Sequence, residues 1–207
     1  IFEDALMLHQ IPLELKYLPV IESAFNPRAR SRVGATGLWQ FMPATGKRYG
    51  LEINSLVDER CDPIKASYAA AKYLKDLYDI FNDWTLVIAA YNCGPNNIVK
   101  AIHRAGGEHD YWKIYPYLPR ETRGYVPAFI AANYVMNYYT DHNILPMHVS
   151  MSTNTDTIIV NKDDKMEKIA NLCNIDINEL RALNPQYSTS LIPGYKMQCT
   201  LRMPQKN

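Results

Sequence analysis

The chain has 207 residues, of which 47% are hydrophobic, and this length accommodates one ordinary domain and a small one. No hydrophobic run is long enough to span a bilayer as a helix. The 22 basic and 21 acidic residues give a net charge of +1, which provides no electrostatic basis for binding nucleic acid.

A helix that carries a carboxylate is predicted near the N-terminus. Leu15, Leu18 and Glu22 follow one another at spacings of three and four residues, which places them on one face of a helix over residues 13–22. Pro19 is expected to bend this helix without ending it. Glu22 therefore closes an otherwise apolar stripe.

Several further helices are predicted before residue 142. Asp62 is expected to cap one of them, because an aspartate followed by a proline is typical of a helix start. Residues 84–91 are almost entirely apolar, which indicates a buried helix. The predicted helices cover residues 63–81, 84–91, 95–104 and 125–139, and residues 31–37 are predicted to form a loop.

The position of Glu22 on an apolar helix face predicts an unusual carboxyl group. Burial penalises the charged form, so the pKa of Glu22 is expected to be raised. A carboxylic acid that keeps its proton near neutral pH is what the cleavage of a glycosidic bond requires. The alternative is an ordinary helix-end glutamate that pairs with Arg28, Arg30 or Arg32.

A second carboxylate, which ordinary glycosidases use as nucleophile or base, is not evident. Asp58, Glu59 and Asp62 precede a helix start, where capping and the helix dipole explain them. Glu121 is flanked by two arginines and is expected to form an ion pair, and Asp83 is expected to be an N-cap. One catalytic acid without a partner is the simplest interpretation.

The composition changes after residue 146. Residues 147–156 are rich in Ser, Thr and Asn and lack periodicity, which predicts a linker. Beyond the linker the pattern predicts a strand, two short helices and a second strand, at residues 157–160, 166–173, 177–183 and 197–203.

Three motifs in the first part of the chain resemble those of lytic transglycosylases. Glu22-Ser23 is followed by Gly-Leu-Trp-Gln-Phe-Met-Pro at residues 37–43 and by Ala-Tyr-Asn-Cys-Gly-Pro at residues 90–95. In this order and spacing they resemble the lysozyme-like SLT domain of that family over residues 10–142. The subgroup that the chain resembles most is the membrane-bound type D, in which such a domain is followed by LysM modules.

The C-terminal part resembles a single LysM module. Leu183-Asn184-Pro185 and Pro193-Gly194 match, whereas Asp163–Met166 departs from the Gly-Asp-Thr-Leu that is usual in the family. Because the departure falls near the family's sugar-binding loops, the resemblance supports the fold of the module more than its binding of glycan. A purely structural appendage is the alternative.

These resemblances imply an α+β chain that is mainly α. A lysozyme-like all-helical catalytic domain is expected over residues 1–146, a linker over 147–156 and a small βααβ LysM-like domain over 157–207.

The resemblance also implies a reaction. The chain is expected to cleave the β-1,4 bond between N-acetylmuramic acid and N-acetylglucosamine in peptidoglycan. Glu22 would protonate the bridging oxygen and then, as a carboxylate, take the proton of the muramoyl C6 hydroxyl, which attacks C1 and closes a 1,6-anhydro ring. An intramolecular hydroxyl held beside its target outcompetes water. No metal ion and no organic cofactor is expected.

Further residues are placed around the substrate by the resemblance, namely Ser31, Gly37, Gln40, Met42, Tyr91, Asn92 and Tyr125. Tyr125 is expected to orient Glu22 through its hydroxyl group, and Tyr91 and Asn92 to face the acid and the sugar. Ser31 and Gln40 are expected to hydrogen-bond the sugar, with a turn serine and a helix-start polar residue as alternatives.

For the smaller and apolar positions the alternatives are structural. Gly37 would let the backbone approach the ligand closely, or would only permit a positive φ angle. Met42 is expected to line the pocket, with a core methionine as the alternative. Trp39 stands where many relatives have Met and is expected to keep an apolar wall.

Two other functions stay open. A hydrolytic muramidase, similar to goose-type lysozyme, differs only in that water attacks, and the sequence separates the two weakly. A catalytically silent cell-wall binding protein is the third possibility. The intact set of Glu22, Gln40, Tyr91, Asn92 and Tyr125 argues against it.

The expected location is the periplasm or the outer-membrane-associated cell envelope, and the expected partner is the glycan strand of peptidoglycan. Both rest on the resemblance, because the chain begins at Ile1 without a Met or a signal-like stretch. We expect a trimmed chain, with any membrane tether in a segment before Ile1, that acts as a monomer and does not bind nucleic acid.

The four cysteines show no metal-type spacing. In an oxidising compartment the expected pairs are Cys61 with Cys93 and Cys173 with Cys199, and four partly buried thiols are the alternative.

Overall fold

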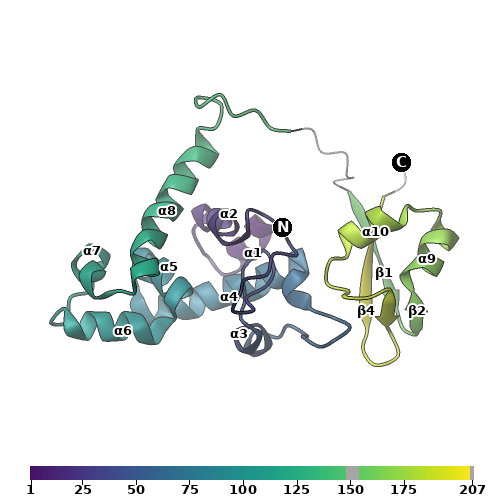
Figure 1. Cartoon of the computed structure of the whole chain (residues 1–207), viewed down its shortest axis with the longest axis horizontal. Helices are drawn as coiled ribbons and strands as arrows, with labels where there is room; N and C mark the ends of the chain where they lie inside the picture. The colour runs from purple at the N-terminus through teal and green to yellow at the C-terminus, as the bar shows by residue number, and fades with distance from the viewer. Residues whose placement is uncertain (148–153, 206–207) are drawn as a thin grey trace. The chain divides into compact units, whose positions relative to one another are not determined.

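The computed structural model describes residues 1–147 and 154–205 (Figure 1). Most of the predicted linker, residues 148–153, lies outside the described residues. The chain forms two compact units, one of Ile1–Phe25 with Ser67–Leu145 and one of Asn26–Ala66 with Pro146–Asn207. No helix in the described ranges is both long enough and apolar enough to cross a bilayer.

The first unit is helical. Its elements are α1 (Phe2–Leu8), the 3-10 helix η1 (Leu13–Tyr17), α2 (Leu18–Ser23), most of α4 (Pro63–Phe81), α5 (Trp84–Cys93), α6 (Pro95–Arg104), α7 (Tyr111–Ile114), the 3-10 helix η3 (Tyr115–Tyr117) and α8 (Arg120–Asn137).

The prediction of one helix over residues 13–22 is wrong in detail. A 3-10 helix ends at Tyr17 and α2 begins at Leu18, so Pro19 lies in the first turn of α2. A proline is tolerated there because the first turn has no intrahelical partner for its missing N–H. The left-handed Ala24 (φ 49°) ends α2 directly after the turn that holds Glu22.

The helices with strong start signals agree with the sequence. Asp62 Oδ1 accepts hydrogen bonds from the first-turn amides of Ile64 and Lys65 and so caps α4. Asp83 accepts from the amide of Leu86 and caps α5. Helix α6 has the predicted bounds, and α5 runs two residues further than the predicted 84–91.

The last helix of the first unit begins earlier than predicted. Helix α8 starts at Arg120 instead of residue 125. Its first turn already contributes a buried side chain, Thr122, to the core. The core of this unit is α5, which packs against both α6 and α8 (Figure 1). Helix α8 also packs against α2 and η1. The end of α2 is thereby held against α8.

The second unit contains a loop-rich segment and a small α+β module. The segment carries α3 (Pro43–Arg48) and the 3-10 helix η2 (Glu59–Cys61), and isolated bridges join Thr36 to Arg30 and to Phe41. We refer to residues 34–41 as the Gln40 loop and to residues 155–204 as the module.

The module has the element order ββααββ. Its elements are β1 (Thr155–Val160), β2 (Asp163–Lys165), α9 (Met166–Cys173), α10 (Ile177–Leu183), β3 (Leu191–Pro193) and β4 (Cys199–Pro204). Strand β1 pairs antiparallel with β4, from Thr155↔Pro204 to Val160↔Cys199, and β2 pairs antiparallel with β3.

The predicted α+β class, mainly α, is confirmed. The two helices of the module have the predicted bounds, and the outer strands lie within two residues of them. Strands β2 and β3 add to the predicted elements; at three residues each they are too short to show a period of two.

All four cysteines lie in the described residues and are free thiols, with Cys61 and Cys199 buried and Cys93 and Cys173 half-buried. The structure thus agrees with the alternative of four thiols, and burial raises the pKa of the Cys61 thiol to about 11.

Candidate active site

Glu22 and Tyr125 form the centre of the candidate site. Glu22 lies in the last turn of α2 and is half-buried, and Tyr125 lies in α8 and is buried. The hydroxyl group of Tyr125 donates a hydrogen bond to Glu22 Oε1. The packing of α2 against α8 is what brings these residues, far apart in the sequence, into contact.

The carboxyl group of Glu22 is a weaker acid than usual. Its pKa is raised from the ordinary 4.5 to about 7. Burial is the main cause, the hydrogen bond from Tyr125 lowers the pKa, and the negative charge of Glu121 raises it. No ion pair among the described residues includes Glu22, so the alternative of a glutamate paired with an arginine is not supported.

Glu121 was predicted to form an ion pair, but it has no ion-pair partner among the residues that the structure describes. It lies in the first turn of α8, one turn before Tyr125, and it is exposed. Arg123, one of its two flanking arginines, instead donates to the carbonyl oxygens of Leu118 and Pro116. Because residues four apart share a helix face, Glu121 is on the side of α8 that carries Tyr125, and its charge acts on Glu22.

Tyr91 and Asn92 lie in the last turn of α5. The ring of Tyr91 lies 5.3 Å from that of Tyr73, and its pKa is raised well above the ordinary value, first by burial and then by the charge of Glu22. Asn92 Oδ1 accepts a hydrogen bond of 2.9 Å from Thr122 Oγ1 of α8. This bond orients the side-chain amide of Asn92.

Four of the predicted site residues therefore belong to the first unit, namely Glu22, Tyr91, Asn92 and Tyr125. The structure brings Glu22, Tyr91 and Tyr125 together, and Thr122 connects Asn92 to the helix that holds Tyr125. The other four belong to the second unit, namely Ser31, Gly37, Gln40 and Met42.

Gln40 has an unusual backbone and a restrained side chain. Its φ angle is +48°, and its Nε2 donates to the carbonyl oxygens of Gly37 (2.8 Å) and Ala29 (3.2 Å). Both amide hydrogens are thus used within the segment. The carbonyl oxygen Oε1 is the part of this half-buried side chain that is left to accept a hydrogen bond.

Ser31 closes a turn, as its alternative interpretation predicted. Its Oγ accepts from the amide of Ala35 (3.0 Å), and its own amide donates to the Ala35 carbonyl oxygen (2.9 Å). The hydroxyl hydrogen is still available as a donor.

Gly37 is required by the protein's own backbone. Its φ angle is +88°, and a Cβ atom at this position would lie 1.8 Å from the carbonyl oxygen of Arg60. Structural need alone thus accounts for this glycine, and its contact with a ligand stays a prediction.

Met42 and Trp39 differ in their exposure to solvent. Met42 is 43% exposed, so it is not a core methionine, and its place beside a ligand stays a prediction. Trp39 is 0% exposed. Its side chain is part of the packed interior, and its expected role as an apolar wall beside the ligand stays a prediction.

The three carboxylates that precede α4 have structural partners. Asp58 caps η2 and pairs with Arg60, and Glu59 is buried beside Lys65 and accepts from the amide of Glu52. Asp62 caps α4 and pairs with Arg202 (2.7 Å). No group of three or more His, Cys, Asp or Glu side chains suited to holding a metal ion occurs within the described ranges.

Sequence reasoning did not single out Thr122 or Arg60. Thr122 precedes Tyr125 by three residues, so the two share a face of α8. A prediction that began this helix at residue 120 would have placed Thr122 beside Tyr125. Arg60 is buried and holds the Gln40 loop, and nothing in the local sequence indicates that.

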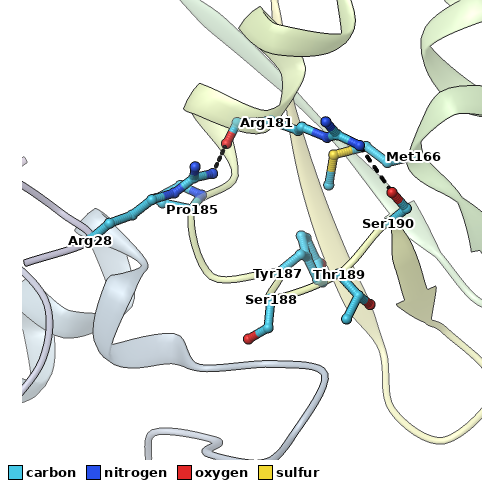
Figure 2. Close-up of a pocket in the computed structure, with 8 residues that line it drawn as sticks. All are labelled: Arg28, Met166, Arg181, Pro185, Tyr187, Ser188, Thr189 and Ser190. Carbon is cyan, nitrogen blue, oxygen red and sulfur yellow. Dashed lines mark hydrogen bonds between the residues drawn. The ribbon is translucent and has the colours of Figure 1, made fainter. Parts of the chain in front are cut away.

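A separate cavity of about 470 Å³ lies within the second unit. Figure 2 shows Arg28, Met166, Arg181, Tyr187 and Ser190 among the residues around it. Arg28 Nη2 donates to the carbonyl oxygen of Arg181 (2.7 Å), and Arg181 Nη2 donates to Ser190 Oγ (3.1 Å).

Comparison with known proteins identifies the family of this chain. The family described as "Transglycosylase SLT domain" matches residues 1–114, which is more than half of the chain. The chain belongs to the transglycosylase SLT family. Residues 154–207 match the family described as "Lytic transglycosylase MltD, LysM-like domain". The SLT match includes Glu22, Gln40 and Tyr91, and Tyr125 lies beyond it.

Similar sequences carry names from the same family. Membrane-bound lytic murein transglycosylase D of Escherichia coli (strain K12) is 34% identical over 178 residues, which is 84% of this chain and 39% of that protein. Soluble lytic murein transglycosylase of the same strain is 33% identical over 124 residues, 57% of this chain and 19% of that protein. This SLT-family chain thus spans well under half the length of these relatives.

Two solved structures share the fold. The 70 kDa soluble lytic transglycosylase of Escherichia coli superimposes with a TM-score of 0.57 at 29% identity, over 67% of this chain and 24% of that one. An inactive mutant of the lytic transglycosylase Slt from Pseudomonas aeruginosa superimposes with a TM-score of 0.56 at 25% identity, over 70% of this chain and 24% of that one.

Proposed function

We propose that this SLT-family protein is a peptidoglycan lytic transglycosylase. It cleaves the β-1,4 bond between N-acetylmuramic acid and N-acetylglucosamine and leaves a 1,6-anhydromuramoyl end. The observation that carries the proposal is a half-buried Glu22 that has a pKa of about 7 and accepts a hydrogen bond from Tyr125.

The pKa of Glu22 suits both halves of this reaction. At neutral pH a large fraction of the protein holds Glu22 protonated, ready to donate to the bridging oxygen as C1 gains oxocarbenium character. The carboxylate that results is a stronger base than an ordinary glutamate, because its pKa is higher. It takes the proton of the muramoyl C6 hydroxyl as that oxygen attacks C1.

The residues around Glu22 have distinct proposed roles. Tyr125 fixes the orientation of the carboxyl group by its hydrogen bond. Tyr91 is held against Tyr73 and stays protonated near Glu22, so it serves as a neutral wall and hydrogen-bond donor. Asn92, whose Oδ1 is occupied by Thr122, presents its amide hydrogens to the substrate.

The second unit supplies proposed sugar contacts. Gln40 offers Oε1, which accepts from a sugar hydroxyl or acetamido N–H, while its Nε2 is held by backbone carbonyls. Ser31 offers its hydroxyl hydrogen, and the exposed Met42 offers an apolar surface. Gly37 keeps the Gln40 loop in its conformation.

A hydrolytic muramidase is the second candidate, and Glu121 is the observation that favours it. Its exposed carboxylate, one turn before Tyr125, acts on Glu22 and has no ion-pair partner among the residues described. A general base of this kind would direct water to C1. In a transglycosylase, Glu121 would act only through its charge, which raises the pKa of Glu22.

The relatives support a proposed setting for the reaction. One of them is named a membrane-bound transglycosylase, so we place this protein at the cell envelope, acting on peptidoglycan as a monomer. The proposed bounds are 1–146 for the transglycosylase domain and 157–207 for the LysM-like domain, separated by a linker.

Digestion of purified peptidoglycan in ¹⁸O-labelled water tests the proposal. Mass spectrometry of soluble products is expected to find unlabelled ends in the 1,6-anhydro form. Labelled reducing ends would instead identify a hydrolase. Binding to insoluble peptidoglycan without any soluble product would favour the third function, a silent cell-wall binding protein.

A further inference from the structure

The module is joined to residues 56–62 by backbone pairing. The amide of Asp58 donates to the Gln186 carbonyl oxygen (2.8 Å), and the amide of Ser188 donates to the Leu56 carbonyl oxygen (2.9 Å). Between these bonds Val57 forms an antiparallel bridge with Tyr187. Val57 is also buried in the hydrophobic core of the module, and Leu56 packs against that core.

A buried ion pair reinforces this junction. Arg202 Nη2, in β4, donates to both oxygens of Asp62, at 2.7 and 3.0 Å. The side chain of Asp62 is 1% exposed and that of Arg202 is 12% exposed. Removal of one partner leaves a buried charge uncompensated, which is strongly destabilising.

The opposite side of the same segment holds the Gln40 loop. Arg60 is 4% exposed, and its Nη1 donates to the carbonyl oxygens of Gly34 (2.8 Å) and Phe41 (2.9 Å), one at each end of the loop. Its Nε and Nη2 bond the carboxylate of Asp58, whose amide pairs with the module. Gly37 packs directly against the Arg60 carbonyl oxygen.

The loop needs such support because its backbone is strained. Gln40 has a left-handed φ of +48°, a conformation that a non-glycine residue adopts only when its surroundings hold it. Arg60 donates two hydrogen bonds to the loop, and its carbonyl oxygen packs against Gly37. Arg60 itself lies in residues 56–62, which are hydrogen-bonded to the module.

We propose that the module is a positioning element for the Gln40 loop, acting through residues 56–62, and that Arg202 is the positioning residue on the module's side. The catalytic meaning of this proposal rests on the proposed function, in which Gln40 contacts the sugar. The structural coupling between Arg202 and the Gln40 loop does not depend on the proposed function.

Hydrogen exchange of the full chain tests the coupling without reference to activity. The amides of Thr36, Gly37 and Phe41 are hydrogen-bonded within the segment and report its opening. In Arg202→Met these amides are expected to exchange on the order of tenfold faster. Arg202→Lys, which keeps a charge for Asp62, is expected to restore most of the protection.

Two further variants make the test decisive. Lys168→Met removes an exposed ion pair with Asp164 inside the module and is expected to leave exchange of the loop unchanged. Asp62→Asn serves if Arg202→Met does not fold, because asparagine still caps α4 while the ion pair is lost. Unchanged exchange of residues 34–41 in the folded variants would overturn the proposal.

The catalytic consequence is measured separately. Arg202→Met is expected to lower kcat/KM for release of soluble muropeptides by about tenfold, with Arg202→Lys closer to wild type. Faster exchange without this loss would show that the module holds the loop but that the loop has no catalytic role. A wild-type protein without any activity would refute the proposed function and leave the exchange result intact.

Discussion

The hydroxyl group of Tyr125 donates a hydrogen bond to Oε1 of Glu22, so a carboxyl group that burial has made a weaker acid is also fixed in direction. The bond stabilises the carboxylate and therefore opposes the effect of burial on the pKa. Burial is the larger effect, and Glu22 titrates near neutral pH. A general acid works best when its pKa lies near the working pH.

Tyr125→Phe is expected to change both the pKa and the orientation of the Glu22 carboxyl group, and a pH profile distinguishes the two effects. Loss of the hydrogen bond is expected to raise the pKa of Glu22 above 7, which moves the fall in activity at alkaline pH to a higher pH. We also expect kcat to decrease by about tenfold, because the carboxyl group loses its fixed direction. The measurement is a pH profile of kcat. Tyr134→Phe, an exposed tyrosine of the same helix, is the control.

Glu121→Gln should shift the same profile in the opposite direction. Removal of the negative charge lowers the pKa of Glu22, so protonated Glu22 is lost at a lower pH and the alkaline limb of the profile moves down. Activity at pH 5.5 is expected to stay close to wild type. Glu108→Gln, which removes a paired exposed carboxylate, serves as the control. A loss of more than about 100-fold at all pH values would instead assign Glu121 a role as a base.

The sequence was most informative where helices carry their own start signals. Asp62, Asp83 and Pro95 predicted the beginnings of three helices correctly, because a cap or a first-turn proline acts within one turn of the chain. The division of residues 13–22 into a 3-10 helix and α2 was not predictable, since both kinds of helix give a similar apolar spacing over so few residues.

The candidate site was predictable only in part, for a related reason. Motif resemblance identified Glu22 and Tyr125, which lie 103 residues apart, but the shifted pKa and the hydrogen bond depend on how α2 packs against α8. The support of the Gln40 loop by Arg60 depends on contacts that form only in the folded protein. Glu121 was expected to pair with a neighbouring arginine, yet Arg123 bonds backbone carbonyls instead.

Glu22→Gln should stabilise the fold at alkaline pH. The pKa of Glu22 is about 7 when folded and 4.5 when fully hydrated, so between these values the folded protein holds a proton that the unfolded chain releases. Stability is therefore lost as the pH rises from 4.5 through 7. Glutamine does not titrate, so Glu22→Gln does not lose stability over this pH range. The substitution is expected to raise the free energy of unfolding by about 1–3 kcal/mol at pH 8.

Urea unfolding of both proteins at pH 8 and pH 4 measures this difference. At pH 4 Glu22 is protonated in the folded state, and the two proteins are expected to have similar stability. A glutamine variant that is less stable than wild type at pH 8 would contradict the shifted pKa.

The Gln40 loop offers a matched pair of glycine substitutions. Gly37→Ala places a Cβ atom 1.8 Å from the Arg60 carbonyl oxygen at a φ of +88°, and we expect a loss of more than about 3 kcal/mol in the free energy of unfolding. Gly34→Ala has the same sign of φ (+89°), but apart from the adjoining residues no atom of the described chain lies within 4 Å of the added Cβ. It is expected to lose only about 1 kcal/mol. Equal losses in urea unfolding would show that the contact with Arg60 is unimportant.

The most direct test compares Glu22→Gln with wild type in the rate at which muropeptides with 1,6-anhydromuramoyl ends are released from purified peptidoglycan. Glutamine keeps the shape and accepts the bond from Tyr125 but cannot donate the proton. We expect a rate at least about 100-fold lower, and no change for Glu14→Gln, which alters an exposed carboxylate of η1. A folded Glu22→Gln protein that kept a tenth or more of the wild-type rate would contradict the assignment of Glu22 as the catalytic acid.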